Sequence, residues 1–280
     1  MVNASDLLTT TYVTCDVNDR ISSLLGKMKR AQEGAAVVTK KGNYLGIVHR
    51  SAFLVSRAHA SDTKVANIYQ RRSKAKSNFF VPTLSRTSSL PVMCKRMLQS
   101  NSRMLPVMEK DRLIGVVKDM ELLKAIAPDF SSIPAFELAS TDSITVRENN
   151  VIYAAMTAMK KHKIGHIPVV DKNGKLLGIL SGYDYLEMHL HSRSRMHQSR
   201  KGTHSDYKNR GFDTGEKISL GDLPVRDFMS EKVITATPRT TIAQCIQLMI
   251  DNNAHSIVLT RYDKPVGVLT CHDIFIHAAQ

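Results

Sequence analysis

The stretch Leu176-Leu177-Gly178-Ile179-Leu180 decides the fold, because its arrangement of two apolar residues, a glycine and two more apolar residues occurs four times. The other copies are Tyr44-Leu45-Gly46-Ile47-Val48, Leu113-Ile114-Gly115-Val116-Val117 and Pro265-Val266-Gly267-Val268-Leu269. The four glycines lie 69, 63 and 89 residues apart. This spacing indicates a repeat of about sixty residues with connectors of variable length.

The residues before each glycine recur in one order. A β-rich stretch that carries a threonine comes first, at residues 12–14, 81–83, 143–145 and 233–235. Seven residues after each threonine, an apolar residue opens an amphipathic helix: Ile21, Leu90, Ile152 and Ile242. A second strand follows, and in the third copy Asn173-Gly174 favours a tight hairpin into the glycine-bearing strand. Each unit is therefore predicted to be a β-α-β-β-α repeat.

The helices of the third and fourth units have one apolar face each. Their apolar residues lie at helical spacing: Ile152, Ala155, Met156 and Met159, then Ile242, Cys245, Ile246 and Met249. We interpret these methionines as core residues rather than as part of a cofactor site. Because a unit of this size has only a marginal core, we expect the units to pair face to face.

These features together resemble CBS (cystathionine-β-synthase-type) repeats. The resemblance includes the opening phrase Val225-Arg226-Asp227-Phe228-Met229-Ser230 and covers nearly the whole chain. It implies an α/β fold of α+β sandwich repeats, in which four β-α-β-β-α CBS units pair into two Bateman modules. The repeats are expected at residues 1–60, 61–128, 133–190 and 218–280, with a basic insert at 191–217. This four-repeat order is similar to that of the regulatory γ subunit of AMP-activated kinase.

The family signature Gly-apolar-x-Ser/Thr-x-x-Asp is complete in two places, Gly178 to Asp184 and Gly267 to Asp273. CBS proteins commonly bind AMP, ADP, ATP or S-adenosylmethionine in the cleft between paired repeats. The resemblance therefore implies that the second half binds AMP, ADP or ATP, with S-adenosylmethionine as a further candidate, and requires no cofactor. The hydroxyl of Ser181 or Thr270 stands where a helix start can bind phosphate. The carboxylate of Asp184 or Asp273 can accept both ribose hydroxyl protons.

Further candidate residues precede the first two strands of these repeats. The adenine is expected in an apolar slot beside Ile144 and Thr145, or beside Ile234 and Thr235. His166 and His255 stand just before the second strand, where some CBS proteins place basic residues that face the phosphates. The alternative for the two histidines is that they are partly exposed residues at the start of a strand.

A structural alternative also exists for the two signatures. Ser-x-x-Asp or Thr-x-x-Asp ahead of an apolar run is a capping-box pattern, in which the hydroxyl and the carboxylate only complete the first turn of a helix. The first half departs from the signature, with His49 and Ala52 in the first repeat and Lys118 and Glu121 in the second. We interpret this half as structural or as an interaction surface. The alternative is that it binds a different, more anionic ligand.

The chain is strongly basic, with 39 Lys and Arg against 25 Asp and Glu, and its net charge of +14 would attract phosphates, nucleic acid or acidic partners. The basic residues gather in two connectors. These connectors are Gln70 to Ser77 and a stretch at 191–210, in which six Lys or Arg stand against Asp206. The longer stretch is predicted to lack a packed core. An alternative function is nucleic-acid binding through residues 191–210, with the repeats as a scaffold.

Several functional classes find no support in the sequence. The apolar runs are too short to span a bilayer, and the N-terminal residues do not read as a secretory signal, so a soluble cytoplasmic protein is expected. Cys15, Cys94, Cys245 and Cys271 lack metal-ligand spacing and are predicted to be buried hydrophobes. We find no nucleophile elbow, P-loop or metal constellation. The prediction is therefore a non-enzymatic sensor that acts on an unidentified effector protein or through its own homodimer.

Overall fold

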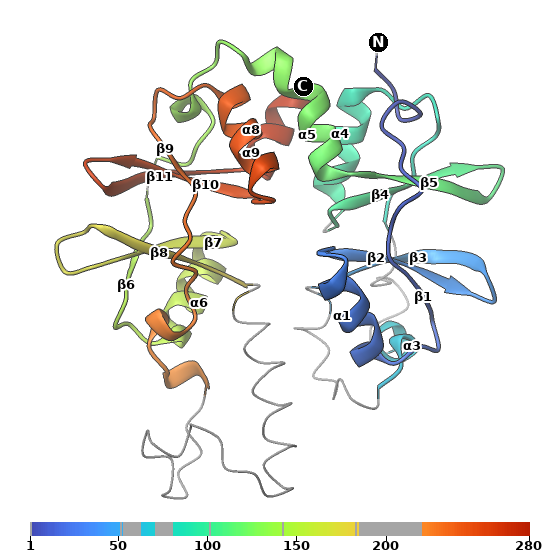
Figure 1. Cartoon of the computed structure of the whole chain (residues 1–280), viewed down its shortest axis with the longest axis horizontal. Helices are drawn as coiled ribbons and strands as arrows, with labels where there is room; N and C mark the ends of the chain where they lie inside the picture. The colour runs from blue at the N-terminus through green and yellow to red at the C-terminus, as the bar shows by residue number, and fades with distance from the viewer. Residues whose placement is uncertain are drawn as a thin grey trace, which may run out of the picture. The chain divides into compact units, whose positions relative to one another are not determined.

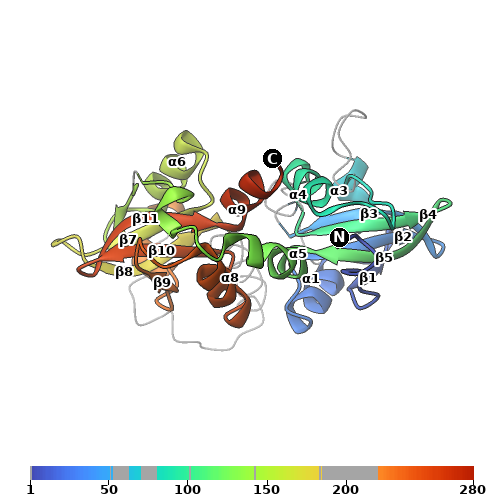
Figure 2. The ribbon, with the colours of Figure 1, turned by 90° about the horizontal axis from the view of Figure 1, so that it is seen from above.

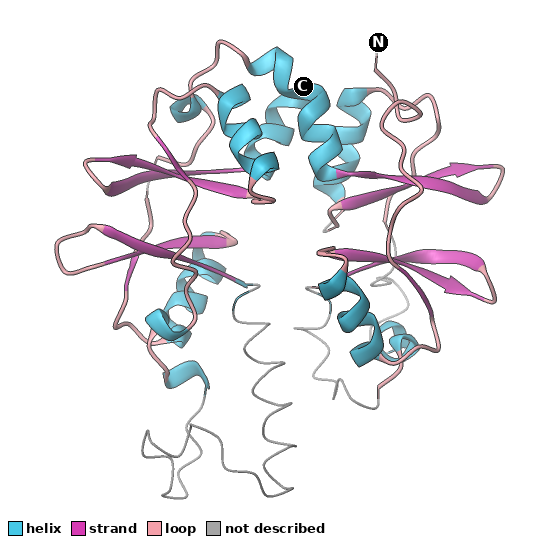
Figure 3. Ribbon diagram, viewed as in Figure 1, coloured by secondary structure: helices cyan, strands magenta, loops and turns pink. Residues whose placement is uncertain are grey.

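A computed structural model of the chain describes residues 2–50, 52, 63–70, 81–100, 102–141, 143–182, 184 and 220–280. Helices and small sheets alternate along it, as Figure 1 and Figure 3 show, and the predicted mixed α/β repeat fold is confirmed. Contacts divide the chain into two compact units. Unit 1 comprises Met1–Ser140, Ala236–Ile257 and Val268–Gln280, and unit 2 comprises Thr141–Thr235 and Val258–Gly267.

The first two repeats lie in unit 1. The elements of the first repeat are β1 (Thr14–Asp16), α1 (Ile21–Arg30), β2 (Ala35–Lys40) and β3 (Asn43–His49). The second has α3 (Val65–Gln70), α4 (Leu90–Gln99), β4 (Met104–Glu109), β5 (Arg112–Lys118) and α5 (Asp119–Ile126), and the short helix η1 (Ala127–Phe130) follows. In the first sheet β1 is parallel to β2 and β2 is antiparallel to β3, whereas the second sheet holds the antiparallel pair β4-β5.

The third and fourth repeats use the same order. The third has the short helix η2 (Ala135–Glu137), β6 (Val146–Arg147), α6 (Ile152–His162), β7 (His166–Val170) and β8 (Leu176–Ser181). The fourth has η5 (Leu220–Asp222), η6 (Val225–Asp227), β9 (Thr235–Ala236), α8 (Ile242–Asp251), β10 (Ser256–Arg261), β11 (Lys264–Thr270) and α9 (Cys271–Ala278). Their sheets are ordered β6-β7-β8 and β11-β10-β9.

The first strand of each repeat starts later than the threonine-bearing stretches suggest. Strands begin at Thr14, Val146 and Thr235, where the expected stretches end or have just ended. In the second repeat the stretch 81–83 contains a proline, which cannot donate to a ladder. There the strand is reduced to a single bridge between Leu84 and Val107. These short first strands pair only with the middle or end of the second strand.

The predicted apolar helix faces are confirmed. Ile152, Ala155 and Met159 of α6 are buried, and Met156 packs against the same cluster. All four predicted residues of α8 are fully buried. The four cysteines are free and buried, as expected. Burial raises the pKa of Cys15 and Cys94 to about 12 and that of Cys245 to about 11, so these thiols stay protonated and unreactive.

The first helices of repeats 1, 3 and 4 are each completed by the partner repeat. The N–H of Ile21, which opens α1, donates to Thr63 O of the second repeat at 2.9 Å. In the second half Ile152 N–H donates to Leu223 O, and Ile242 N–H donates to Ile133 O. Return bonds run from Val65, Val225 and Ala135 to carbonyls just ahead of the helices they face. Reciprocal bonds of this kind show that repeat 1 pairs with repeat 2 and repeat 3 with repeat 4.

The recurring glycine lets a segment of the partner repeat pass close to the strand that carries the glycine. A Cβ added to Gly115 would lie 2.7 Å from Leu8 Cγ and 2.8 Å from Thr9 O. Thr9 exchanges both backbone hydrogen bonds with Val116, the next residue of β5. Gly178 of the third repeat has the same role, with Met229 and Ser230 above it. The sequence motif therefore reflects how two repeats pack rather than a turn.

Helices from the second and fourth repeats form the core of unit 1. Helix α4 packs against α9, and α5 packs against both α8 and α9, as Figure 2 shows from above. The ring of Phe130, which follows α5, lies 5.6 Å from that of His277 on α9. The last repeat thus supplies helices to the unit that holds the first two repeats.

Replacing Gly115 by Ala is expected to lower the free energy of unfolding by about 1–3 kcal/mol, because the added methyl overlaps backbone as well as side-chain atoms. Gly26→Ala in the interior of α1 is the matched control. Its nearest atom is 3.5 Å away, and helix propensity predicts a gain of about 0.5–1 kcal/mol. Urea unfolding of both variants measures the difference. Equal stability of the two would contradict the close crossing.

Candidate functional site

The signature of the third repeat forms a compact hydrogen-bonded group at the end of β8. Ser181 donates from its backbone N–H and from Oγ to Asp184 Oδ2, at 2.7 Å and 2.6 Å. The Asp184 N–H donates back to Ser181 Oγ at 3.4 Å. His166 is the first residue of β7 and pairs directly with Ser181 across the two strands. The structure therefore brings His166, Ser181 and Asp184 together in unit 2.

The fourth repeat repeats this geometry in unit 1. Thr270 donates from N–H and Oγ1 to Asp273 Oδ2, at 2.8 Å and 2.6 Å, and receives a 3.4 Å bond from the Asp273 N–H. Together these bonds form a capping box at the start of α9. His255 adjoins it through the backbone, because its carbonyl accepts the N–H of Cys271, the first residue of α9.

Both signatures thus perform the structural role that capping residues have. All the hydrogen bonds that the Asp273 side chain accepts go to Oδ2, so within the described residues Oδ1 has no hydrogen-bond partner. A capping carboxylate in this position can still accept a ribose hydroxyl on its second oxygen. The capping and ligand roles are therefore compatible, and the ribose contact stays a prediction.

The residues expected beside the adenine lie just before or at the start of the first strands. Ile144 packs against the apolar cluster under α6, whereas its neighbour Thr145 is exposed. In the fourth repeat the Ile234 carbonyl accepts Val258 N–H at 3.0 Å, and Thr235 is exposed on β9. In each pair the isoleucine anchors the strand and the threonine faces solvent.

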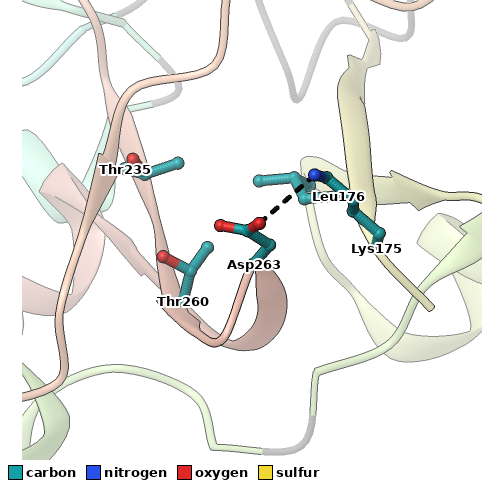
Figure 4. Close-up of a pocket in the computed structure, with 5 residues that line it drawn as sticks. All are labelled: Lys175, Leu176, Thr235, Thr260 and Asp263. Atoms are coloured by element: carbon teal, nitrogen blue, oxygen red, sulfur yellow. Dashed lines mark ion pairs between the residues drawn. The ribbon is translucent and has the colours of Figure 1, made fainter.

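One pocket of about 210 Å³ in unit 2 contains a predicted site residue. It is lined by Lys175, Leu176, Thr235, Thr260 and Asp263 (Figure 4). Lys175 Nζ lies 3.2 Å from Asp263 Oδ2, but both side chains are mostly exposed, so this ion pair contributes at most about 1 kcal/mol. The pocket is smaller and more polar than typical ligand pockets. It does not match the apolar adenine slot expected beside Thr235.

A buried polar cluster surrounds His255. Its Nε2 lies 3.1 Å from Asp119 Oδ2, and Arg103 Nη1 lies 2.7 Å from its Nδ1 and 2.9 Å from its Nε2. A neutral ring that donates from Nε2 to Asp119 and accepts Arg103 N–H at Nδ1 satisfies both contacts. Burial lowers the pKa of His255, in agreement with a neutral ring, although its bond to Asp119 acts in the opposite direction.

His49 belongs to the same cluster. A Cβ added at Gly34 would meet both Arg103 Cδ and His49 Nε2 at 3.6 Å, so the two side chains lie beside each other. Burial, with a further contribution from the Arg103 guanidinium, lowers the pKa of His49 to about 3. The position that holds Ser or Thr in the second half therefore holds a neutral, enclosed histidine here.

With this geometry in place, the chain can be compared with known proteins. The CBS domain family matches it four times, over residues 4–58, 79–128, 135–190 and 225–279. The chain belongs to the CBS domain family. The crystal structure of protein MJ1225 from Methanocaldococcus jannaschii, which has been proposed as an archaeal homologue of g-AMPK, covers 99% of both chains with a TM-score of 0.75 at 15% identity. At that identity the likeness concerns the fold alone.

Two relatives by sequence match shorter parts. The chain is 24% identical over 196 residues to the uncharacterized protein MJ1404 of M. jannaschii, which covers 69% of this chain and 44% of that protein. It is 29% identical over 105 residues to a homoserine O-acetyltransferase of Methanosphaerula palustris, which covers 37% of this chain and 21% of the enzyme. The chain therefore spans less than half the length of each of these relatives.

In the first CBS pair, the residue that replaces the signature hydroxyl of the second repeat forms a contact within the pair. Lys118, which replaces the hydroxyl residue of the second repeat, forms an ion pair with Glu33 of the first repeat. Glu121 is exposed at the start of α5. This arrangement agrees with a structural interpretation of the first half, because the basic side chain already has a carboxylate from the partner repeat.

Sequence reasoning missed Arg103 and Asp119. The repeat itself carries a signal for Arg103, because it stands where His255 stands in the fourth repeat. The carbonyls of both residues accept the N–H of the residue that opens the next helix, Asp119 for Arg103 and Cys271 for His255. Alignment of the repeats on their shared glycine would have placed Arg103 among the basic candidates, because Arg103 precedes Gly115 by 12 residues, as His255 precedes Gly267.

Other predictions fall outside the described residues or concern absences. The insert at 191–217 and the stretch 71–77 lie outside the description, so nucleic-acid binding through residues 191–210 stays a prediction. In the described part of the chain, no helix combines the length and apolar character needed to cross a membrane. Within those same residues, no three His, Cys, Asp or Glu side chains gather closely enough to hold a metal ion.

Replacing His49 by Gln is expected to flatten the pH dependence of stability below about pH 6.5. An unfolded histidine binds a proton near that pH, whereas folded His49 stays neutral down to about pH 3. Stability is therefore lost as pH falls, with a slope approaching about 1.4 kcal/mol per pH unit for one such group. Urea unfolding of both proteins between pH 7.5 and 5 measures this. If stability falls with pH equally in both proteins, His49 binds its proton as readily in the folded chain as in the unfolded one.

Proposed function

We propose that this CBS protein is a non-enzymatic cytoplasmic sensor of adenine nucleotides, which binds AMP, ADP or ATP at its second pair of repeats. One observation carries the proposal. Both repeats of that pair place a hydroxyl and an aspartate at the start of a helix, beside a histidine at the start of the second strand, whereas neither repeat of the first pair does. S-adenosylmethionine is the further candidate, because it has the same adenosine moiety.

The chemistry of these helix starts suits a nucleoside phosphate. The first N–H groups of a helix favour an anion, and Thr270 Oγ1 stands among them at α9. Asp273 offers Oδ1 to the two ribose hydroxyls, which are hydrogen-bond donors that inorganic phosphate lacks. A site that reads both groups would therefore prefer nucleotides to free phosphate.

Signalling would follow from differential binding. A ligand that binds one conformation of the chain more tightly than another shifts the population toward that conformation, so occupancy is converted into a conformational change. The output would pass to an effector protein or to a second copy of the chain. In this proposal the first pair of repeats, with its internal Lys118–Glu33 ion pair, serves as a scaffold.

Adenine nucleotides are expected to raise the melting temperature of the purified protein. A ligand at 100 times its Kd adds about 2.7 kcal/mol to the free energy of unfolding. The screen compares AMP, ADP, ATP, GTP and S-adenosylmethionine by thermal shift and calorimetry. Binding of no adenosine compound at millimolar concentration would overturn the proposed function.

Asp184→Asn and Asp273→Asn are expected to weaken AMP binding by about tenfold each, because a hydrogen bond to a charged acceptor contributes about 1.5–3 kcal/mol. The analogue 2′,3′-dideoxyadenosine monophosphate separates ribose recognition from capping. The wild type should bind the analogue more weakly than AMP, and the double variant should bind both equally. Asp251→Asn, on the exposed end of α8, is the control. If the double variant still discriminates between the two ligands, the carboxylates act only as caps.

A further inference from the structure

The buried carboxylate of Asp119 lies in a cluster of basic groups next to the proposed nucleotide site of repeat 4. We propose that Asp119, a residue of repeat 2, sets how strongly this site prefers phosphate-bearing ligands over adenosine. The inference rests on the proposed function and deepens it, because it assigns the phosphate preference of repeat 4 to a residue of another repeat.

Asp119 is held firmly in its place. It is only 6% exposed, and its Oδ1 accepts the N–H of Met120 in the first turn of α5. Its Oδ2 accepts His255 at 3.1 Å. The carboxylate therefore cannot move away without breaking both contacts.

The cluster extends to the helix start that carries the proposed ribose clamp. His255 bonds to Asp119 and Arg103 through its side chain and to Cys271 N–H through its carbonyl. The charges of the cluster also act on this first residue of α9. The pKa of the Cys271 thiol is raised mainly by burial and next by Asp119, while Arg103 lowers it. A phosphate bound at the first N–H groups of α9 would experience the electrostatic fields of both Asp119 and Arg103.

The neutral histidine makes Arg103 the cation that matters here. Both ring nitrogens of His255 are engaged, Nε2 with Asp119 and Nδ1 with Arg103. The ring itself therefore has no second N–H to offer a phosphate. Asp119 and Arg103 then act in opposite directions on a bound anion, and the carboxylate offsets part of the attraction that the guanidinium supplies.

Removal of the Asp119 charge should strengthen phosphate binding specifically. A unit charge about 10 Å from a bound phosphate changes affinity by roughly tenfold in a partly buried setting. We therefore expect Asp119→Asn to bind AMP about tenfold more tightly than the parent chain and adenosine within twofold of it. Arg103→Gln should act in reverse, with AMP bound about tenfold more weakly and adenosine unchanged.

Titration calorimetry of full-length chains with AMP and with adenosine tests this. All chains carry Asp184→Asn, so that only the clamp of repeat 4 remains. Asp129→Asn is the matched control, because it removes one negative charge from an exposed position just beyond the opposite end of α5. It should leave both affinities unchanged. Circular dichroism establishes that each variant is folded, and if Asp119→Asn is not, the Arg103→Gln chain decides the question.

The outcomes separate this inference from the proposed function. An unchanged or lowered ratio of AMP to adenosine affinity in Asp119→Asn would overturn the inference, while adenosine binding in the parent chain upholds the proposed site. The inference also fails if Asp129→Asn raises AMP affinity as much as Asp119→Asn does, because the effect would then come from net charge. If the wild-type chain binds neither compound, both proposals are overturned.

Discussion

The architecture depends on hydrogen bonds that one repeat supplies to another. A helix leaves its first backbone N–H groups without intrahelical partners, and buried donors of this kind must be satisfied. Here the N–H that opens α1, α6 or α8 finds its acceptor in the partner repeat, as with Ile21 and Thr63. A single repeat would leave that donor and the apolar face behind it uncovered. A pair is therefore the smallest unit that satisfies these donors, and the chain contains two pairs.

The second helices α5 and α9 differ, because their opening N–H finds its acceptor within the same repeat. At α9 the cap comes from the chain's own Thr270 and Asp273 rather than from a partner carbonyl. The hydroxyl and the carboxylate of this signature therefore stand at a helix start whose opening N–H is satisfied within its own repeat. In the second repeat Lys118 and Asp119 stand at the corresponding place and form contacts with other repeats instead. The start of the second helix thus serves as a helix cap and candidate ligand contact in one repeat, and as a contact with other repeats in another.

Local patterns predicted most of the fold, because the repeat, the helix faces and the hairpins are encoded within short stretches. Ile152 and Ile242 open their helices where the threonine spacing places them. The exact start of the first strands was missed, since their extent depends on which part of the second strand they meet. At the candidate site, Ser181 with Asp184 and Thr270 with Asp273 form the hydrogen bonds of the capping pattern, and their contact with a ligand stays a prediction. The contact between Arg103 and His255 joins residues 152 positions apart, and no local pattern specifies such a pair.

The packing of α4 against α9 has a consequence for how the protein is made. Helix α4 starts at Leu90, whereas α9 starts only at Cys271. A ribosome that adds about 5–20 residues per second needs roughly ten to forty seconds to cover that interval. During that time the nascent N-terminal half exposes the apolar surface that the last repeat will cover. Holdase chaperones are therefore expected to engage this half during translation and to dissociate once the final helix has emerged.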